Sequence, residues 1–136
     1  MPTPATAVRA TLVAGLWIGL SEFVRNEVLL PARWDAHYAA LGLTFPRDPI
    51  NVAVWLVWSL VFAGVLYALT RRFSLAATTA IGWTVGFVMM WLVTWNMAVL
   101  PLGILPFAIP LSLLETFVAA YLCLRLAPQR GSTPTA

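Results

Sequence analysis

The sequence is poor in charge, in cysteine and in histidine, and these scarcities exclude several classes of protein. Only 10% of the 136 residues are charged, whereas 61% are hydrophobic. The mean hydropathy of +0.87 lies outside the norm for soluble globular proteins. Cys123, the only cysteine, has no partner for an intrachain disulfide. Together with His37, the only histidine, it cannot supply a metal ligand set, so we expect no metal and no cofactor.

Sequence motifs for phosphate binding, nucleophilic catalysis and nucleic-acid recognition are also missing. There is no glycine-rich phosphate loop and no nucleophile beside a base, which gives little support to an enzyme. The isoelectric point near 9.8 comes from eight arginines, since lysine is absent. Most of these arginines flank apolar segments and do not cluster on a polar face. We therefore expect a lipid bilayer as the partner, and no nucleic acid.

Four apolar segments are long enough to cross the hydrocarbon core of a bilayer, which takes about 20 residues. They cover roughly residues 8–30, 50–69, 76–100 and 106–126, and they leave no room for a soluble domain. The sequence predicts an all-α membrane protein with four transmembrane helices in an antiparallel bundle. We expect a single domain over residues 1–127, followed by a disordered tail at 128–136 that is rich in Pro, Ser, Thr and Gly.

The connection between the first two spans is the only long one. Within residues 32–45, Trp34 and Tyr38 share a helical face with Leu41, opposite a more polar side. This pattern predicts a short amphipathic helix in the membrane interface, with His37 as a hydrogen-bonding surface group. The same segment could instead act as a lid over a cavity that opens beside the first span.

The placement of the arginines predicts the orientation. One side would carry arginines without any acidic residue, at Arg9, Arg71, Arg72, Arg125 and Arg130. The other side combines arginine with aspartate in the first loop and carries no charge in the third. Positively charged loops stay in the cytoplasm, so we expect both termini there and, in a bacterial cell, an inner-membrane location.

Two features of the first and third spans suggest close helix packing and an internal repeat. Each span holds a GxxxG motif, Gly15–Gly19 and Gly82–Gly86, which allows close approach of another backbone. Each span also carries an asparagine followed four residues later by Leu-Pro. This similarity indicates a tandem repeat of two helical hairpins, with chance resemblance of apolar segments as the alternative. A homo-oligomer or a larger membrane complex is also plausible, because four short helices bury little area alone.

Ionisable groups inside the first and fourth spans form the candidate site. Counted by helical rise, Glu22 and Glu115 lie roughly 12 and 14 Å below the same outer boundary. Charge is costly in hydrocarbon, so we expect Arg25 to bridge the two carboxylates, capped by the amides of Asn26 and Asn96. One carboxyl should then take up a proton or hold a cation, because the cluster has excess negative charge. Further candidates for the same faces are Trp55, Ser59 and Ser112.

Three functions fit this cluster. The first is a structural, accessory or binding subunit whose ligand is unknown, with the ion pairs fixing helix register. The alternative is a proton-coupled small-molecule transporter that uses the two intramembrane carboxylates. The third is a membrane-embedded lipid-modifying enzyme that uses carboxylates together with His37.

Resemblance to known families is limited to short stretches. Four helices with a glutamate in the first span resemble the small multidrug resistance transporters. The chain departs from that family in its long first loop, its arginine bias and its second carboxylate, Glu115. The Arg25-Asn26 segment is similar to part of the membrane-associated eicosanoid and glutathione enzymes but lacks their fuller Arg/His pattern. The sequence therefore assigns no family.

Overall fold

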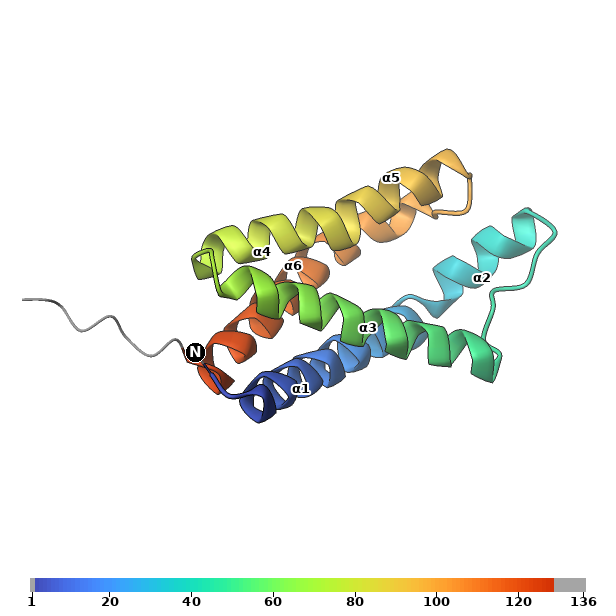
Figure 1. Cartoon of the computed structure of the whole chain (residues 1–136). Helices are drawn as coiled ribbons and strands as arrows, with labels where there is room; N and C mark the ends of the chain where they lie inside the picture. The colour runs from blue at the N-terminus through green and yellow to red at the C-terminus, as the bar shows by residue number, and fades with distance from the viewer. Residues whose placement is uncertain (1, 129–136) are drawn as a thin grey trace, which may run out of the picture.

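The structure, a computed structural model, describes residues 2–128, and every regular element in that range is helical (Figure 1). The elements in chain order are α1 (Pro4–Phe23), η1 (Val24–Leu29), α2 (Pro31–Ala40), α3 (Pro49–Thr70), α4 (Leu75–Trp83), η2 (Thr84–Val88), α5 (Met89–Asn96), η3 (Leu102–Ile104) and α6 (Leu105–Leu126). The prediction of an all-α fold is confirmed. The tail predicted at 128–136 lies, from residue 129 on, outside the described residues.

Four helical stretches are long and apolar enough to cross a membrane, as predicted. They cover Pro4–Leu29, Pro49–Thr70, Leu75–Asn96 and Leu102–Leu126. The first begins four residues earlier than expected, because Thr3 accepts a hydrogen bond from the Thr6 amide and Pro4 occupies the first turn. The third ends four residues early, at Asn96, shortly before Ala98 turns the backbone to a φ of 60°.

Two of these stretches contain a π-helical segment. η1 continues α1, and η2 joins α4 to α5. A π turn holds more residues than an α turn, so the side chains that follow it are rotated from their α-helical positions. This rotation corrects one sequence-based expectation. Thr78 and Gly82, before η2, are buried, whereas Met89 and Asn96, after it, are exposed, so Asn96 does not lie at the buried cluster where it was expected.

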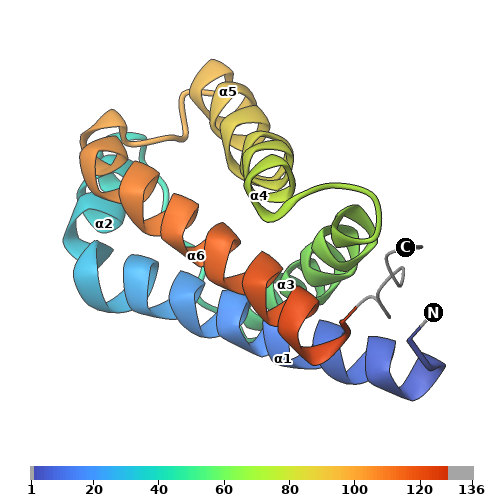
Figure 2. The same ribbon diagram turned by 90° about the vertical axis from the view of Figure 1, so that its left-hand side faces the viewer.

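Small residues set the helix contacts. α1 lies along both α3 and α6, and α4 closes the other side of α6 (Figure 2). A Cβ atom placed on Gly15 would lie 2.7 Å from Leu60 Cδ2 and 3.3 Å from Leu60 Cα, so α1 and α3 approach closely only because that position is glycine. A Cβ atom on Gly86 would lie 2.8 Å from the Phe62 ring.

Hydrogen bonds tie the connections together at two ends of the molecule. At one end, Arg71 Nη1 donates to the carbonyl of Ala127 at 2.6 Å. At the other, Arg33 Nη1 donates to the Gly103 carbonyl at 2.9 Å, and His37 Nε2 lies 2.9 Å from the carbonyl oxygen of Ala98. The connection between α3 and α4 therefore contacts the end of α6, and α2 contacts the connection between α5 and α6.

The two predicted hairpins meet at one pair of equivalent positions. Leu30 and Leu100, the leucines of the two Leu-Pro pairs, are both 5% exposed and belong to one apolar cluster with Ile104 and Ala108. The π segments, however, fall at different distances from these leucines. The internal repeat therefore stays a prediction.

Candidate functional site

The centre of the site is a buried arginine that bridges two buried carboxylates from different helices. Arg25, in η1, donates from Nη2 to Glu22 Oε1 one turn before it. Its Nη1 donates to Glu115 Oε2 of α6 at 2.8 Å. All three residues are buried, with 6%, 5% and 1% of the surface of Glu22, Arg25 and Glu115 exposed. The planar guanidinium can satisfy two carboxylates at once, as the sequence led us to expect.

An asparagine extends this cluster toward α2. Asn26 Nδ2 donates to Glu22 Oε2 at 2.8 Å, and Asn26 Oδ1 accepts from Trp34 Nε1 at 3.0 Å. Trp34 thereby fastens α2 to the ion-pair cluster. The face of the Phe87 ring lies against the other side of Arg25, 5.2 Å from the guanidinium carbon.

Glu115 keeps one oxygen free within this arrangement. Its Oε1 atom is buried and has no hydrogen-bond partner among the described residues. The backbone carbonyl of the same residue accepts from Trp17 Nε1 at 3.0 Å, which holds α1 and α6 together at this level. A buried oxygen without a donor is costly, so this atom is suited to receive a proton or a donor group from a ligand.

The cluster borders a cavity of about 720 Å³. Glu22, Arg25 and Asn26 line it on one side, and Ser59 and Thr94 add hydroxyl groups from α3 and α5. The rest of the wall is mainly apolar, with aromatic rings at Trp34, Tyr38, Phe45, Trp55 and Trp91. A concave, mostly apolar space with a few converging polar groups is typical of small-molecule sites.

α2 and the residues after it form one part of the wall of this cavity. Arg47 Nε pairs with Glu27 Oε2 at 2.6 Å, and Arg47 Nη1 pairs with Asp35 Oδ1 at 2.7 Å. The hydrogen bonds that Arg47 donates to Asp35 and Glu27 raise the pKa of Arg47, which stays charged. The guanidinium carbon also lies 4.8 Å from the centre of the Phe45 ring. These contacts join η1, α2 and the connection to α3, all three of which contribute residues to the cavity wall.

Negative charge exceeds positive charge around the cavity. Glu22, Arg25, Glu27 and Arg47 line it, Glu115 pairs with Arg25, and Asp35 pairs with Arg47. The four charged residues that line the cavity balance one another, and Glu115 and Asp35 bring the net charge of all six to −2 when every group is ionised. The excess negative charge of the site therefore depends on the ionisation of Glu115 and Asp35, which do not line the cavity.

The remaining predicted residues divide between cavity and packing. Trp55 and Ser59 line the cavity, and the Ser59 hydroxyl donates to the Trp55 carbonyl at 2.8 Å. Ser112 lies elsewhere, where it accepts from Trp83 Nε1 at 2.9 Å and joins α4 to α6. Asn96 does not cap the cluster: it is exposed at the end of α5, because η2 changes the helical register before it.

Sequence reasoning missed part of the cavity wall. Trp34 and Tyr38 were expected at the membrane interface, yet both line the cavity. Phe45 and Trp91 were not singled out at all, whereas Arg47 was one of two arginines expected to pair with Glu27, and it does. The aromatic spacing of residues 34–45 was the available signal, since it also allowed a lid. Nothing in the sequence indicated Trp91, whose position depends on the π segment before it.

The fold and the site define a small all-helical protein with four helices long and apolar enough to cross a membrane, built around a buried ion-pair cluster beside a cavity. Among the described residues, no group of three or more metal-ligating side chains gathers in one place. No family model, no curated protein and no solved structure matches the chain.

Proposed function

We propose that the four long helices cross a cell membrane (the inner membrane in a bacterial cell) as an antiparallel bundle, with both termini in the cytoplasm. Large apolar side chains are exposed on all four helices, for example Leu12, Val57, Leu92 and Leu114, as lipid contact requires. The hydrogen bond between Arg71 and Ala127 supports the arrangement, because it joins the second connection to the C-terminal end of α6, and both would be cytoplasmic.

Labelling in intact cells tests this orientation. An impermeant maleimide should label a cysteine at Gly42, in the first loop, and should spare one at Phe73, in the second. Cys123 is buried and gives little background. Labelling of Phe73→Cys with protection of Gly42→Cys would reverse the orientation.

The cavity is the observation that favours a binding function. A cluster that only fixes helix register needs no open space beside it, whereas Glu22, Arg25 and Asn26 line a cavity of about 720 Å³. Of the functions that the sequence allows, the geometry therefore best supports a membrane binding protein or subunit for a small molecule.

An amphipathic cation matches this cavity best. The excess of carboxylates attracts positive charge, and the faces of Trp34, Trp55 and Trp91 suit both an apolar body and a cationic head. We expect the cationic head to lie beside Glu22, because this carboxylate lines the cavity. Arg25 links it to the second carboxylate, Glu115.

Proton-coupled transport is the second candidate function, and one atom favours it. Glu115 Oε1 has no partner, and two carboxylates share one guanidinium, so the cluster has room for one proton. Binding of a cation beside Glu22 and uptake of that proton would then compete for the same negative charge. Opening of α2 would expose the cluster to the outside.

No contact favours the lipid-modifying enzyme. His37, its proposed partner for the carboxylates, is half-buried, lies against the Ala98 carbonyl and does not line the cavity. The carboxylate and histidine arrangement is therefore not formed among the described residues.

Binding of benzyltrimethylammonium, a compact aromatic cation, tests the binding function. The purified protein should gain thermal stability and lose tryptophan fluorescence when the cation is added. Glu22→Gln should weaken binding at least tenfold, because it removes a negative charge from the cavity wall, and Asn96→Ala should leave binding unchanged. Ser59→Phe, which fills the cavity without touching the ion pairs, provides a second variant if Glu22→Gln does not fold. Equal binding by wild type and both cavity variants would contradict the proposal.

A further inference from the structure

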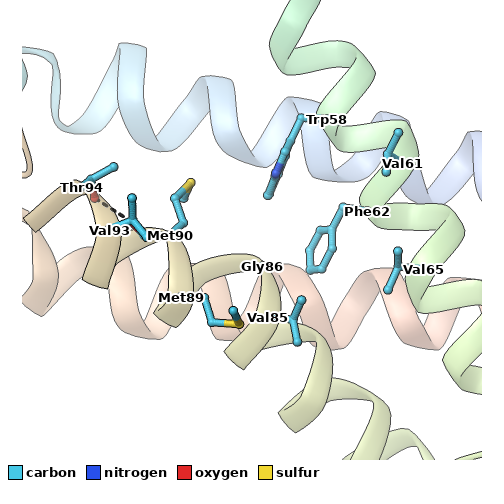
Figure 3. A pocket seen from close by; sticks show the side chains of 10 residues that line it. All are labelled: Trp58, Val61, Phe62, Val65, Val85, Gly86, Met89, Met90, Val93 and Thr94. Carbon is cyan, nitrogen blue, oxygen red and sulfur yellow. Dashed lines mark hydrogen bonds between the residues drawn. The ribbon is translucent and has the colours of Figure 1, made fainter. Parts of the chain in front are cut away.

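A second apolar space lies between α3 and α5, on the outside of the bundle. Figure 3 shows it as an open groove, with Trp58 and Phe62 projecting from α3 and Met90 from α5. Its volume is about 470 Å³. Thr94 is the one hydroxyl on its wall, and that group is already bonded to the Met90 carbonyl at 2.9 Å. Besides the indole N–H of Trp58, the described residues of the wall therefore offer a ligand no free hydrogen-bond donor.

The π segment η2 shapes this groove. Gly86, inside η2, allows the Phe62 ring to approach the backbone at a position where a Cβ atom would be only 2.8 Å away. At this point α3 and the third span touch, and beyond it α5 runs away from α3 (Figure 1). The groove occupies the space between the two helices after they separate.

The groove and the cavity are neighbours with common walls. Met90 and Thr94 line both spaces. On α3, Trp58 of the groove contacts Trp55 of the cavity edge to face, with ring centres 5.6 Å apart. Only side chains separate the two spaces at this point, and the Met90 side chain is flexible and can be displaced.

Polarity changes steadily along this route. The groove, on the outside, is mainly apolar. The aromatic rings of Trp58 and Trp55 come next, and the charged cluster at Glu22 and Arg25 lies farthest inside. A molecule with a charged head and an alkyl tail matches that order, because each part would lie in surroundings of its own polarity. A helix from a second copy of the chain could cover the groove but would leave the cavity behind it unfilled.

We propose that the ligand is a single-chain amphiphilic cation that lies across both spaces, with its head beside Glu22 and its alkyl chain in the groove between α3 and α5. This inference rests on the proposed binding function and names the class of ligand. The chain passes Met90 and leaves the protein sideways into the bilayer. Lipid-dissolved amphiphiles can then reach the site without crossing the lid formed by α2.

The test compares a long and a short probe, dodecylammonium and ethylammonium, on protein in nanodiscs. In Met90→Trp the larger ring obstructs the passage, so dodecylammonium affinity should fall about tenfold while ethylammonium affinity stays the same. Leu92→Trp is the matched control, because Leu92 is on the same helix, is exposed and lines neither space. It should change neither affinity.

The outcomes separate this inference from the proposed function. If wild-type protein binds neither probe, the binding function itself fails. If both probes bind and Met90→Trp weakens neither, or weakens both equally, the groove does not hold the chain and the inference is overturned.

A second measurement does not depend on the fold of Met90→Trp. Dodecylammonium with a terminal diazirine should label residues 85–94 of the wild-type protein after illumination. Labelling confined to residues 41–47 would place the chain under the lid and overturn the inference. Cross-linking between Val93→Cys residues of two copies, together with no labelling at 85–94, would assign the groove to a second copy and overturn it as well.

Discussion

Removing Arg25 should destabilise the protein far more than removing the entire ion-pair cluster. Arg25→Gln leaves Glu22 and Glu115 buried together, with 6% and 1% of their surfaces exposed and no other cation at hydrogen-bond distance among the described residues. Loss of one partner from a buried ion pair typically costs about 3–5 kcal/mol, because the remaining charge is uncompensated. We expect Arg25→Gln to lose free energy of unfolding in this range.

The triple variant Glu22→Gln, Arg25→Met, Glu115→Gln removes every charge of the cluster and keeps its approximate volume. Neutral replacement of buried ion pairs is often close to neutral for stability, so this variant should unfold within about 1 kcal/mol of wild type. Tryptophan fluorescence during unfolding by SDS in mixed micelles measures both values. Arg72→Gln, at an exposed arginine, serves as control and should stay within about 0.5 kcal/mol of wild type.

The stabilities of Arg25→Gln and of the triple variant, compared with each other, test this reasoning. If Arg25→Gln costs less than about 1 kcal/mol, water already compensates the charge of the two carboxylates. The cluster would then be hydrated, although its residues have little exposed surface. If the triple variant is as unstable as Arg25→Gln, packing around Arg25 matters more than its charge.

Three further predictions concern packing and the lid. Gly15→Val should lose about 1–3 kcal/mol of stability through its clash with Leu60, whereas Gly64→Val, where a Cβ atom comes no closer than 4.0 Å to its nearest neighbour, should change stability by no more than about 0.5 kcal/mol in the same SDS titration. Arg47→Gln should speed dissociation of benzyltrimethylammonium and abolish the effect of salt on that rate, because it breaks the exposed ion pairs between Arg47 and both Glu27 and Asp35. Stopped-flow fluorescence measures the dissociation rate, and an unchanged rate would show that these pairs do not restrain the lid. Trp34→Phe should cost about 0.5–1.5 kcal/mol, the net value of its hydrogen bond to Asn26, and a cost near zero in thermal unfolding would show that this bond does not hold α2.

The fold was predictable because it depends on runs of apolar residues. A run of about 20 such residues predicts a membrane-spanning helix, whichever face each residue occupies. The ends of the spans were less certain: the third helix stops at Asn96 because Ala98 takes a φ of 60°, a local turn that hydropathy does not reveal.

The cluster of Glu22, Arg25 and Glu115 was predictable from cost and depth. Charges inside a span must find partners, and Glu22 and Glu115 lie at similar distances from the same boundary. Asn96 failed for a different reason. Its expected face assumed a continuous α-helix from residue 76, and the π segment at Thr84–Val88 rotates the residues that follow it.

The cavity was not predictable from the sequence in any detail. Its walls come from elements far apart in the chain, including Trp34 of α2, Ser59 of α3 and Trp91 of α5. Their meeting depends on tertiary packing, and in particular on the divergence of α5 from α3 after Gly86.

Thiol accessibility inside the bundle tests most directly whether the cluster borders an open cavity. Ser59 and Ser112 are both buried serines, but only Ser59 lines the cavity. Ser59→Cys should react with water-soluble aminoethyl methanethiosulfonate, and faster than with the anionic sulfonatoethyl reagent, because the surroundings are negative. Ser112→Cys and the native Cys123 should stay unmodified under the same conditions. If Ser59→Cys is as unreactive as Ser112→Cys, the helices pack around the ion pairs without a water-accessible cavity. That result would contradict the proposed binding function.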